Sequence, residues 1–241
     1  MERVIAITRV SKYLNAAFLP NNQIFTLDLF VFALGDAGNL ALLQSSIHDA
    51  WTRKQSSTQE TRMRYTATDS FETMPQPARK DMLHEIGASY SDLRSSIMQE
   101  SQLGLTKLYN RFHTDIEHDP RIKRLRELQC EMDGAVALAY GWDDLDLEHG
   151  FHKVPYLPEN DRIRFTISEA ARVEVLQRLS KLNRQRYEEE CAQGLHGRKT
   201  TGTAARKLSA QRTENTPARQ SSFGFDTALQ PIAPFMEIKN D

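Results

Sequence analysis

Apolar residues recur at spacings of three and four in three long segments of the second half of the chain, and this pattern restricts the fold more than any other feature. A 3-4 repeat places its side chains along one stripe of an α-helix. In residues 78–103 the stripe is a narrow seam suited to packing against another helix. Its members are Leu83, Ile86, Tyr90, Leu93 and Ile97. Three such helices can bury one another, so the sequence predicts a helical, bundle-like segment over residues 78–196.

Local signals mark the ends of the second and third helices. Asp119 is a capping residue followed by proline at the first helical position, and Gly141 ends that helix. The third helix has Thr166 to Glu169 available as a capping box. The stretch between these two helices is rich in turn formers, so we expect mostly loop, ending in the short strand-like run RIRFTI.

The first 77 residues read as a mixture of strands and helix. RVIAITRV (3–10) and IFTLDLFVFAL (24–34) are β-branched and aromatic, which predicts strands. NLALLQSSIHDAW (39–51) carries one apolar helical stripe. The prolines of SFETMPQP (70–77) cannot sit in a regular element, so we place a domain boundary after residue 77. The predicted fold class is α+β. The stripe comprises Leu40, Leu43, Ile47 and Trp51.

The end of the chain differs in composition from the rest. Residues 197–222 contain six Lys or Arg against one Glu and almost no large apolar side chain. Such a segment cannot bury enough surface to offset the entropy lost on ordering. We therefore expect residues 197–241 to be a disordered basic tail, which either binds DNA phosphates or only keeps the chain soluble.

Charge and cysteine usage exclude some classes of protein. The formal net charge of -1 gives no overall attraction to nucleic acid or membrane, so any such preference is local. The two cysteines lie in charged, helix-like stretches, which favours a reduced, cytoplasmic protein over a disulfide scaffold. The most apolar run, residues 24–34, is too short to span a bilayer and carries Asp28. We expect no membrane association.

The stretch ETRMRYT has the alternation of a strand with one charged face. Glu60, Arg62 and Arg64 point to the same side, and the residues between them point to the other. In a DNA major groove an Arg fork matches guanine O6 and N7, while a carboxylate can accept from cytosine N4. The acid and one Arg two residues away could therefore read both halves of one G·C pair. The other Arg could read a neighbouring base or hold a phosphate. The alternative is a solvated strand face whose ion pair contributes little.

Other groups of reactive residues lack the spacing that their chemistry needs. His149 and His152 have no cysteine or paired carboxylate to complete a zinc site, which favours structural histidines. The acidic run from Asp143 to Glu148 lacks the ordering of a calcium loop. GDAGN (35–39) lacks the full dinucleotide and P-loop patterns, so it reads as a helix cap. The sequence predicts no catalytic, metal or cofactor site.

Taken in order, these segments resemble the C-terminal part of the type IIG, MmeI-like restriction-modification enzymes and related adenine-specific DNA methyltransferases. The resemblance covers roughly residues 1–196 and depends on the order of many short stretches. The matching stretches are IAITRVSKYL, FVFAL, ALLQSSIHDAW, RYTATDSFETMPQP, GLTKLYNRFH, RLRELQCEMD with AYGW, HGFH and RFTISEAARVEVLQRLSKLNRQRY. It implies a partial target-recognition domain at residues 1–77 followed by a helical C-terminal segment.

The resemblance also implies roles for the charged strand. Glu60 and Arg62 would be the pair that chooses a base, and Arg64 a further base or backbone contact. Members of the family make N6-methyladenine from S-adenosylmethionine, using a glycine-containing motif and an Asn-Pro-Pro-Tyr/Phe motif that this sequence lacks. No nuclease Asp/Glu-x-Lys cluster can be placed either. S-adenosylmethionine is therefore implied for a parent enzyme and no cofactor is expected in this chain.

We infer a sequence-specific recognition module, a fragment of a restriction-modification N6-adenine methyltransferase that is not catalytic by itself. Its expected partners are double-stranded DNA and a methyltransferase subunit encoded separately. The alternative is a helical interaction protein in which residues 78–193 dock on a methyltransferase and no base is read. In a fragment, strand edges left unpaired would make the isolated chain poorly soluble.

Overall fold

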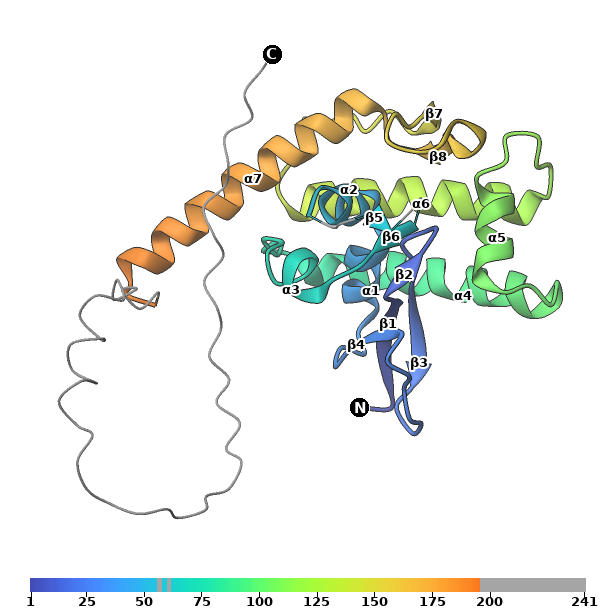
Figure 1. Cartoon of the computed structure of the whole chain (residues 1–241), viewed down its shortest axis with the longest axis horizontal. Helices are drawn as coiled ribbons and strands as arrows, with labels where there is room; N and C mark the ends of the chain where they lie inside the picture. The colour runs from blue at the N-terminus through green and yellow to red at the C-terminus, as the bar shows by residue number, and fades with distance from the viewer. Residues whose placement is uncertain (56–57, 60–61, 196–241) are drawn as a thin grey trace, which may run out of the picture. The chain divides into compact units, whose positions relative to one another are not determined.

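The computed structural model describes residues 1–55, 58–59 and 62–195 (Figure 1). Small sheets and helices alternate in the first part and helices dominate the second, which confirms the α+β class. None of the helices in these ranges combines the length and apolar character needed to cross a bilayer. In chain order the elements are β1 (Arg3–Thr8), β2 (Val10–Ser11), β3 (Ala16–Pro20), β4 (Leu29–Phe32), α1 (Ala37–Gln44), α2 (Ser46–Gln55), β5 (Thr58–Gln59), β6 (Arg62–Arg64), α3 (Ala67–Ser70), η1 (Lys80–Leu83), α4 (His84–Glu100), α5 (Leu105–Phe112), α6 (Pro120–Ala139), β7 (Gly150–Lys153), η2 (Glu159–Asp161), β8 (Ile163–Thr166) and α7 (Glu169–Ala192).

The first sheet has the antiparallel order β3-β1-β4. In its register Ile5 of β1 lies between Phe18 and Phe32. Ile5 and Ile7 are fully buried in one core with residues of α1. The predicted strand at residues 24–34 is shorter than expected, because only β4 joins the ladder. Strand β3 was not predicted from the sequence.

Arg9 connects this sheet to the second one, which has the order β2-β6-β5. Its amide donates to the carbonyl of Asp28 at 2.7 Å, while its own carbonyl accepts from the amide of Tyr65 at 2.8 Å. The expected single strand over residues 3–10 is therefore two strands in two sheets. One residue carries hydrogen bonds to both.

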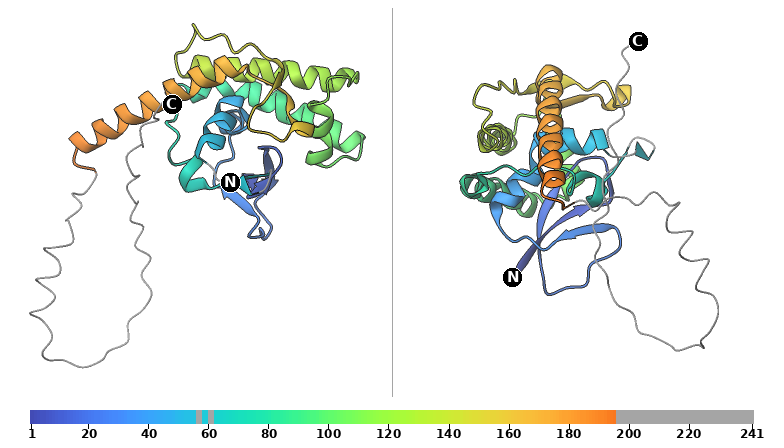
Figure 2. Two further views of the ribbon diagram at one scale, coloured as in Figure 1. Left: turned by 45° about the horizontal axis from the view of Figure 1, so that its top comes forward. Right: turned by 90° about the vertical axis from the view of Figure 1, so that its left-hand side faces the viewer.

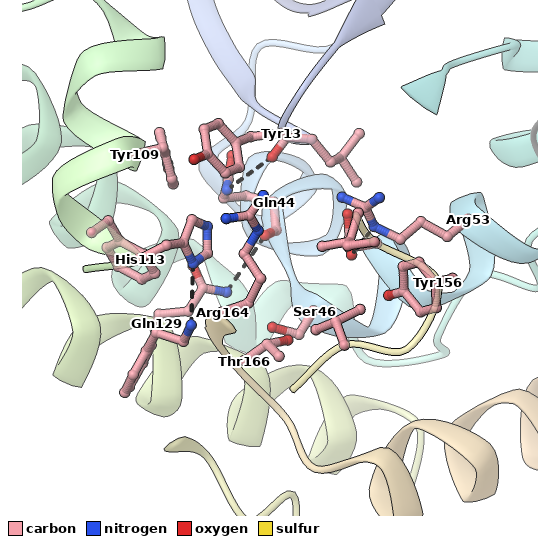
Figure 3. Close-up of a pocket in the computed structure, with 16 residues that line it drawn as sticks. Tyr13, Gln44, Ser46, Arg53, Tyr109, His113, Gln129, Tyr156, Arg164 and Thr166 are labelled. Carbon is pink, nitrogen blue, oxygen red and sulfur yellow. Dashed lines mark hydrogen bonds and ion pairs between the residues drawn. The ribbon is translucent and has the colours of Figure 1, made fainter. Parts of the chain in front are cut away.

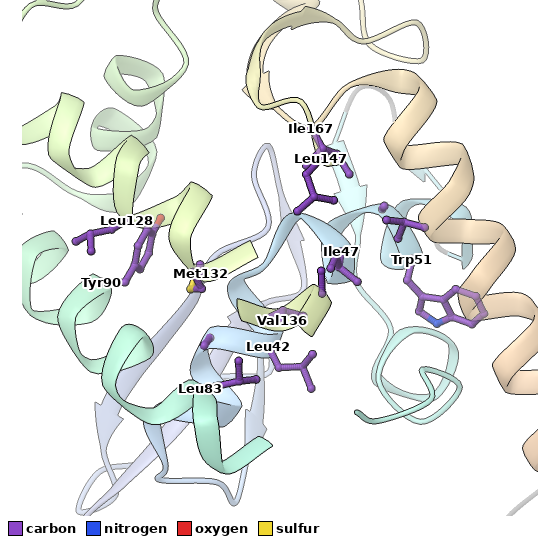
Figure 4. Close-up of a cluster of buried hydrophobic side chains, with 14 of the residues drawn as sticks. Leu42, Ile47, Trp51, Leu83, Tyr90, Leu128, Met132, Val136, Leu147 and Ile167 are labelled. Atoms are coloured by element: carbon purple, nitrogen blue, oxygen red, sulfur yellow. The ribbon is translucent and has the colours of Figure 1, made fainter. Parts of the chain in front are cut away.

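The predicted helix over residues 39–51 is two helices, α1 and α2, separated at Ser45. The Ser45 backbone is extended (φ -65°, ψ 152°), and the amide of Ser46 donates to Asp133 Oδ1 at 2.8 Å. The predicted common stripe is also wrong. Leu40 and Leu43 pack in the core of the first sheet, whereas Ile47 and Trp51, the other two members, pack in the helical core (Figure 4).

Helices α1, α4 and α6 lie side by side, as Figure 2 shows from two further directions. Three members of the predicted seam on residues 78–103, Leu83, Tyr90 and Ile97, are fully buried. A Cβ built on Gly87 would lie 2.0 Å from the carbonyl oxygen of Ala37. Glycine at this position of α4 therefore permits the close approach of α1.

Helix α6 begins and ends where its sequence signals predict. The Asp119 side chain accepts from the amide of Arg121 at 2.9 Å, and Gly141 adopts a positive φ of 79° just beyond the helix. Helix α5, which precedes it, was not predicted as a separate element. Its Leu108 and Phe112 are buried in the same core.

The stretch between α6 and α7 is mostly loop, as predicted, but it also contains strand β7, which was not predicted. Strand β7 pairs with β8, which matches the predicted RIRFTI strand, so that Phe151 faces Phe165 across the ladder. The predicted capping box is not formed because Thr166 belongs to β8. Ser168 caps α7 instead, its Oγ accepting from the amide of Ala171 at 3.1 Å.

Contacts between residues divide the chain into two units, Met1–Asn183 and Arg184–Asp241. Of the second unit the structure describes residues 184–195, which form the end of α7 and a turn at Gly194. The boundary expected after residue 77 stays a prediction. The predicted tail, residues 197–241, lies outside the described residues.

Candidate nucleic-acid interface

Strand β6 is the middle strand of the second sheet, and it has two different faces. Arg62 and Arg64 are exposed, whereas Met63 and Tyr65 are buried at 3% and 1% exposure. This alternation is the one expected from ETRMRYT. Glu60, the third predicted site residue, lies outside the described residues, so its side stays a prediction.

Packing fixes which side of β6 faces the solvent. The Tyr65 ring lies against Phe30 and Phe32, with centroid distances of 5.7 and 6.3 Å. Met63 belongs to the same core. Because side chains alternate with a period of two, a shift of one residue would expose Tyr65 and bury both arginines. The core therefore sets the direction of Arg62 and Arg64.

A buried histidine anchors the inner side of β6. His48 Nδ1 lies 2.9 Å from Met74 Sδ, and Nε2 lies 3.2 Å from the Tyr65 hydroxyl and 3.4 Å from that of Thr52. Burial lowers the pKa of His48 to about 3, so the ring is neutral at pH 7. Because a thioether only accepts, Nδ1 carries the proton and Nε2 accepts from the Tyr65 hydroxyl. Sequence reasoning missed His48, since its spacing suggests no function.

The flanking strands define what surrounds the exposed arginines. Val10 of β2 pairs with Arg64, and Gln59 of β5 pairs with Arg62. The chain leaves β2 after Ser11, which pairs with Met63. Lys12 therefore follows at the end of β6 where Arg62 lies.

A cavity of about 70 Å³ lies near the end of β2, among residues from several elements (Figure 3). The His113 ring stacks on Tyr13 with centroids 4.9 Å apart, and its Nδ1 accepts from the amide of Phe165 at 3.2 Å. Burial lowers the pKa of His113 well below its ordinary value, and the charges of Arg164 and Arg53 act in the same direction. The ring is therefore neutral in an electropositive surrounding. Sequence patterns could not reveal the cavity, because the residues that line it are far apart along the chain.

The other candidate residues make contacts within the protein. His149 Nε2 lies 2.8 Å from Asp133 Oδ2, and His152 Nε2 donates to the carbonyl of Glu148 at 2.7 Å. In the acidic run, Asp144 accepts two hydrogen bonds from Arg178, at 2.7 and 2.6 Å. Across the described ranges, no three metal-ligating side chains converge on a common point.

The GDAGN segment caps a helix as predicted. Asp36 is the N-cap of α1, and its Oδ1 accepts from the amide of Gly38 at 2.7 Å. The other carboxylate oxygen lies 2.6 Å from His84 Nδ1. The Gly38 amide, a donor of the kind that a phosphate-binding turn presents to its ligand, is thus used within the fold.

Comparison with known proteins supports the resemblance found in the sequence. Residues 2–78 match the family model described as "MmeI, target recognition domain". The fold is similar to a solved structure of the type IIL restriction-modification enzyme MmeI in complex with DNA, with a TM-score of 0.54 and 20% sequence identity. Comparison with curated protein sequences finds no match.

The structural similarity covers 75% of this chain, so it extends beyond the recognition-domain segment into the helices. It covers 21% of the other chain. This chain therefore spans about a fifth of the length of the enzyme that it resembles.

Proposed function

We propose that the chain is a DNA target-recognition module of a restriction-modification enzyme that methylates adenine at N6. The observation that carries the proposal is the exposed pair Arg62 and Arg64 on β6, inside the segment that matches the recognition-domain family. Two guanidinium groups at alternate positions of one strand can reach neighbouring base edges. A major groove is wide enough for paired β-strands, and β6 is paired with β2 on one side and β5 on the other.

Arg62 is assigned the main reading role. Its fork of N–H donors matches the O6 and N7 acceptors of guanine, which no other base pair presents in that arrangement. Arg64 would contact a neighbouring base or a phosphate. Glu60 would accept from the cytosine N4 amine of the same pair, an assignment that rests on the sequence alone.

We assign the methylation chemistry to another part of a longer enzyme or to a partner subunit. The sequence holds no Asn-Pro-Pro-Tyr/Phe motif, and the structural similarity covers only 21% of the matched enzyme. The parent would use S-adenosylmethionine. This chain would choose the site at which that enzyme acts.

The test measures binding of the purified chain to duplexes in which each base pair of a selected target is varied. Arg62→Ala is expected to weaken binding by about 1 to 3 kcal/mol and to remove the preference at one base pair. Arg79→Ala is the matched control, because Arg79 is an exposed arginine outside the second sheet. Equal weakening on every duplex would place Arg62 on the phosphate backbone and overturn base reading by this residue.

A further inference from the structure

Asp161 lies between two cations from distant parts of the chain. Its Oδ1 accepts from Lys12 Nζ at 2.9 Å and from Arg164 Nη1 at 2.8 Å, and its Oδ2 accepts from Arg164 Nη2. Lys12 Nζ also donates to Asn110 Oδ1 at 3.3 Å and lies 5.1 Å from the ring centroid of Tyr13. Carboxylate and phosphate oxygens are both acceptors for an ammonium group, so a phosphate can compete with Asp161 for Lys12.

The location of Lys12 connects this cluster to the exposed arginines. Strand β2 runs antiparallel to β6, with Val10 paired to Arg64 and Ser11 to Met63. Lys12 comes next and therefore leaves the sheet at the end where Arg62 lies. Neighbouring strands are about 4.8 Å apart, so the backbone of Lys12 starts close to that of Arg62. A lysine there is suited to the phosphates that flank a base read by Arg62.

The two cations differ in their freedom to move. The side chain of Lys12 is 36% exposed, whereas that of Arg164 is 8% exposed. If Lys12 turned away, Asp161 would keep both hydrogen bonds from Arg164 and would not be left unpaired. A partly exposed ion pair of a flexible lysine contributes little to stability. Lys12 can therefore exchange one acidic partner for another at low cost.

We propose that Lys12 contacts the DNA backbone beside Arg62, and that Asp161 holds this lysine in the free protein and competes with the phosphate. The inference rests on the proposed function and adds a positioning contact to it. Asp161 would lower the affinity for all duplexes equally, and the base preference would still come from Arg62.

The protonation states agree with this pairing. Burial alone would raise the pKa of Asp161, but the hydrogen bonds from Arg164 and Lys12 outweigh it and lower the pKa overall. For Lys12, burial lowers the pKa, but the interactions with Asp161 and Tyr13 together outweigh burial and raise the pKa overall. Both groups are charged at neutral pH.

The experiment measures the affinity of the full chain for one duplex over a range of salt concentrations. Lys12→Ala is expected to reduce the slope of log affinity against log salt by about 0.9, the value of one phosphate contact. Lys181→Ala, which removes an exposed lysine from α7, is the matched control and should leave the slope unchanged. Lys12→Ala keeps the Asp161–Arg164 pair, so the fold should persist, and a thermal melt checks this.

The second arm tests the competition. Asp161→Asn is expected to raise affinity about 1.5- to 5-fold, the range of a partly exposed ion pair. Glu159→Gln changes the net charge equally on the same turn and should give no such gain. The gain should disappear in the double variant Lys12→Ala/Asp161→Asn.

Three results would overturn the proposal. These are an unchanged salt slope in Lys12→Ala, a gain in Asp161→Asn that equals that of Glu159→Gln, or a gain that persists without Lys12. A separate result decides the proposed function. If Arg62→Ala leaves the base preference intact while Lys12→Ala changes the salt slope, base reading by Arg62 fails and the phosphate contact of Lys12 stands. If the chain binds no duplex even at low salt, both the proposed function and the phosphate contact are overturned.

Discussion

The carboxylate of Asp133, which is fully buried on α6, lies 2.8 Å from Nε2 of His149 in the loop before β7. Asp133 Oδ1 also accepts from the amide of Ser46 and from the side chain of Gln129, at 2.8 and 3.0 Å. One acid thus connects the α1–α2 break, α6 and the β7–β8 hairpin. Of these three partners of Asp133, only His149 can carry a positive charge.

This pair predicts a loss of stability at high pH. Burial alone would lower the pKa of His149, but the interactions with Asp133 and with the Cys130 side chain together raise it to about 10, above the ordinary 6.5. A raised pKa stabilises the fold fully below about pH 6.5, and this contribution disappears as the pH approaches 10. The contribution is roughly 3 to 5 kcal/mol.

Urea unfolding at pH values from 6 to 10 measures this dependence. The free energy of unfolding should decrease across the range in the native sequence and much less in His149→Gln. Equal slopes for the two proteins would show that His149 is not charged in the folded state.

A second prediction concerns the contact between α1 and α4. Gly87→Ala would bring a Cβ within 2.0 Å of the Ala37 carbonyl oxygen, which the backbone must relieve by moving. We expect a loss of about 2 kcal/mol or more, despite the better helix propensity of alanine. Gly134→Ala on α6 is the control, because nothing lies within 4 Å of its added Cβ, and it should stabilise by up to about 1 kcal/mol. Thermal melts of both variants give the comparison, and a stable Gly87→Ala protein would contradict the close approach.

Replacing the buried Arg94 should lower the stability of the fold strongly. Its guanidinium is buried and donates to the Ala16 carbonyl at 2.7 Å, to Gln44 Oε1 at 3.1 Å and to the Tyr109 hydroxyl at 3.3 Å. Arg94→Met keeps much of the side-chain volume but removes every donor. The expected cost is about 2 to 4 kcal/mol, measured by denaturant unfolding, with Arg94→Lys recovering only part of it. A Met variant as stable as the native protein would mean that water or another donor replaces the guanidinium.

Salt dependence separates DNA reading from the alternative of a helical docking protein. Each phosphate that a cation neutralises releases a counterion, so DNA binding should weaken steeply as salt rises. Docking through apolar helix faces should change little over the same range. Fluorescence anisotropy with a labelled duplex measures the first, and the same salt series with a purified methyltransferase measures the second.

The parts of the fold that follow from the sequence are those set by neighbouring residues. Asp119 and Gly141 mark the two ends of α6, as predicted, because capping depends on local backbone and side-chain chemistry. The alternation around Arg62 and Arg64 is predictable for the same reason, since the period of a strand is a property of its own backbone.

Features decided by distant residues could not be read from the pattern. The stripe from Leu40 to Trp51 is periodic, yet the helix breaks at Ser45, where the amide of Ser46 donates to Asp133. The two halves of the stripe therefore pack in two different cores. The ion pair of Lys12 with Asp161 likewise joins segments whose proximity only the tertiary fold creates. Local propensity gives way where a buried polar group takes a backbone donor.

The two sheets share Arg9, which bonds to Asp28 through its amide and to Tyr65 through its carbonyl. Any sliding of β6 along its own axis would therefore pull on the neighbouring sheet through a single residue. A molecule bound to β6 should change the rate at which the Arg9 amide hydrogen exchanges with solvent, so that this amide reports binding from the neighbouring sheet.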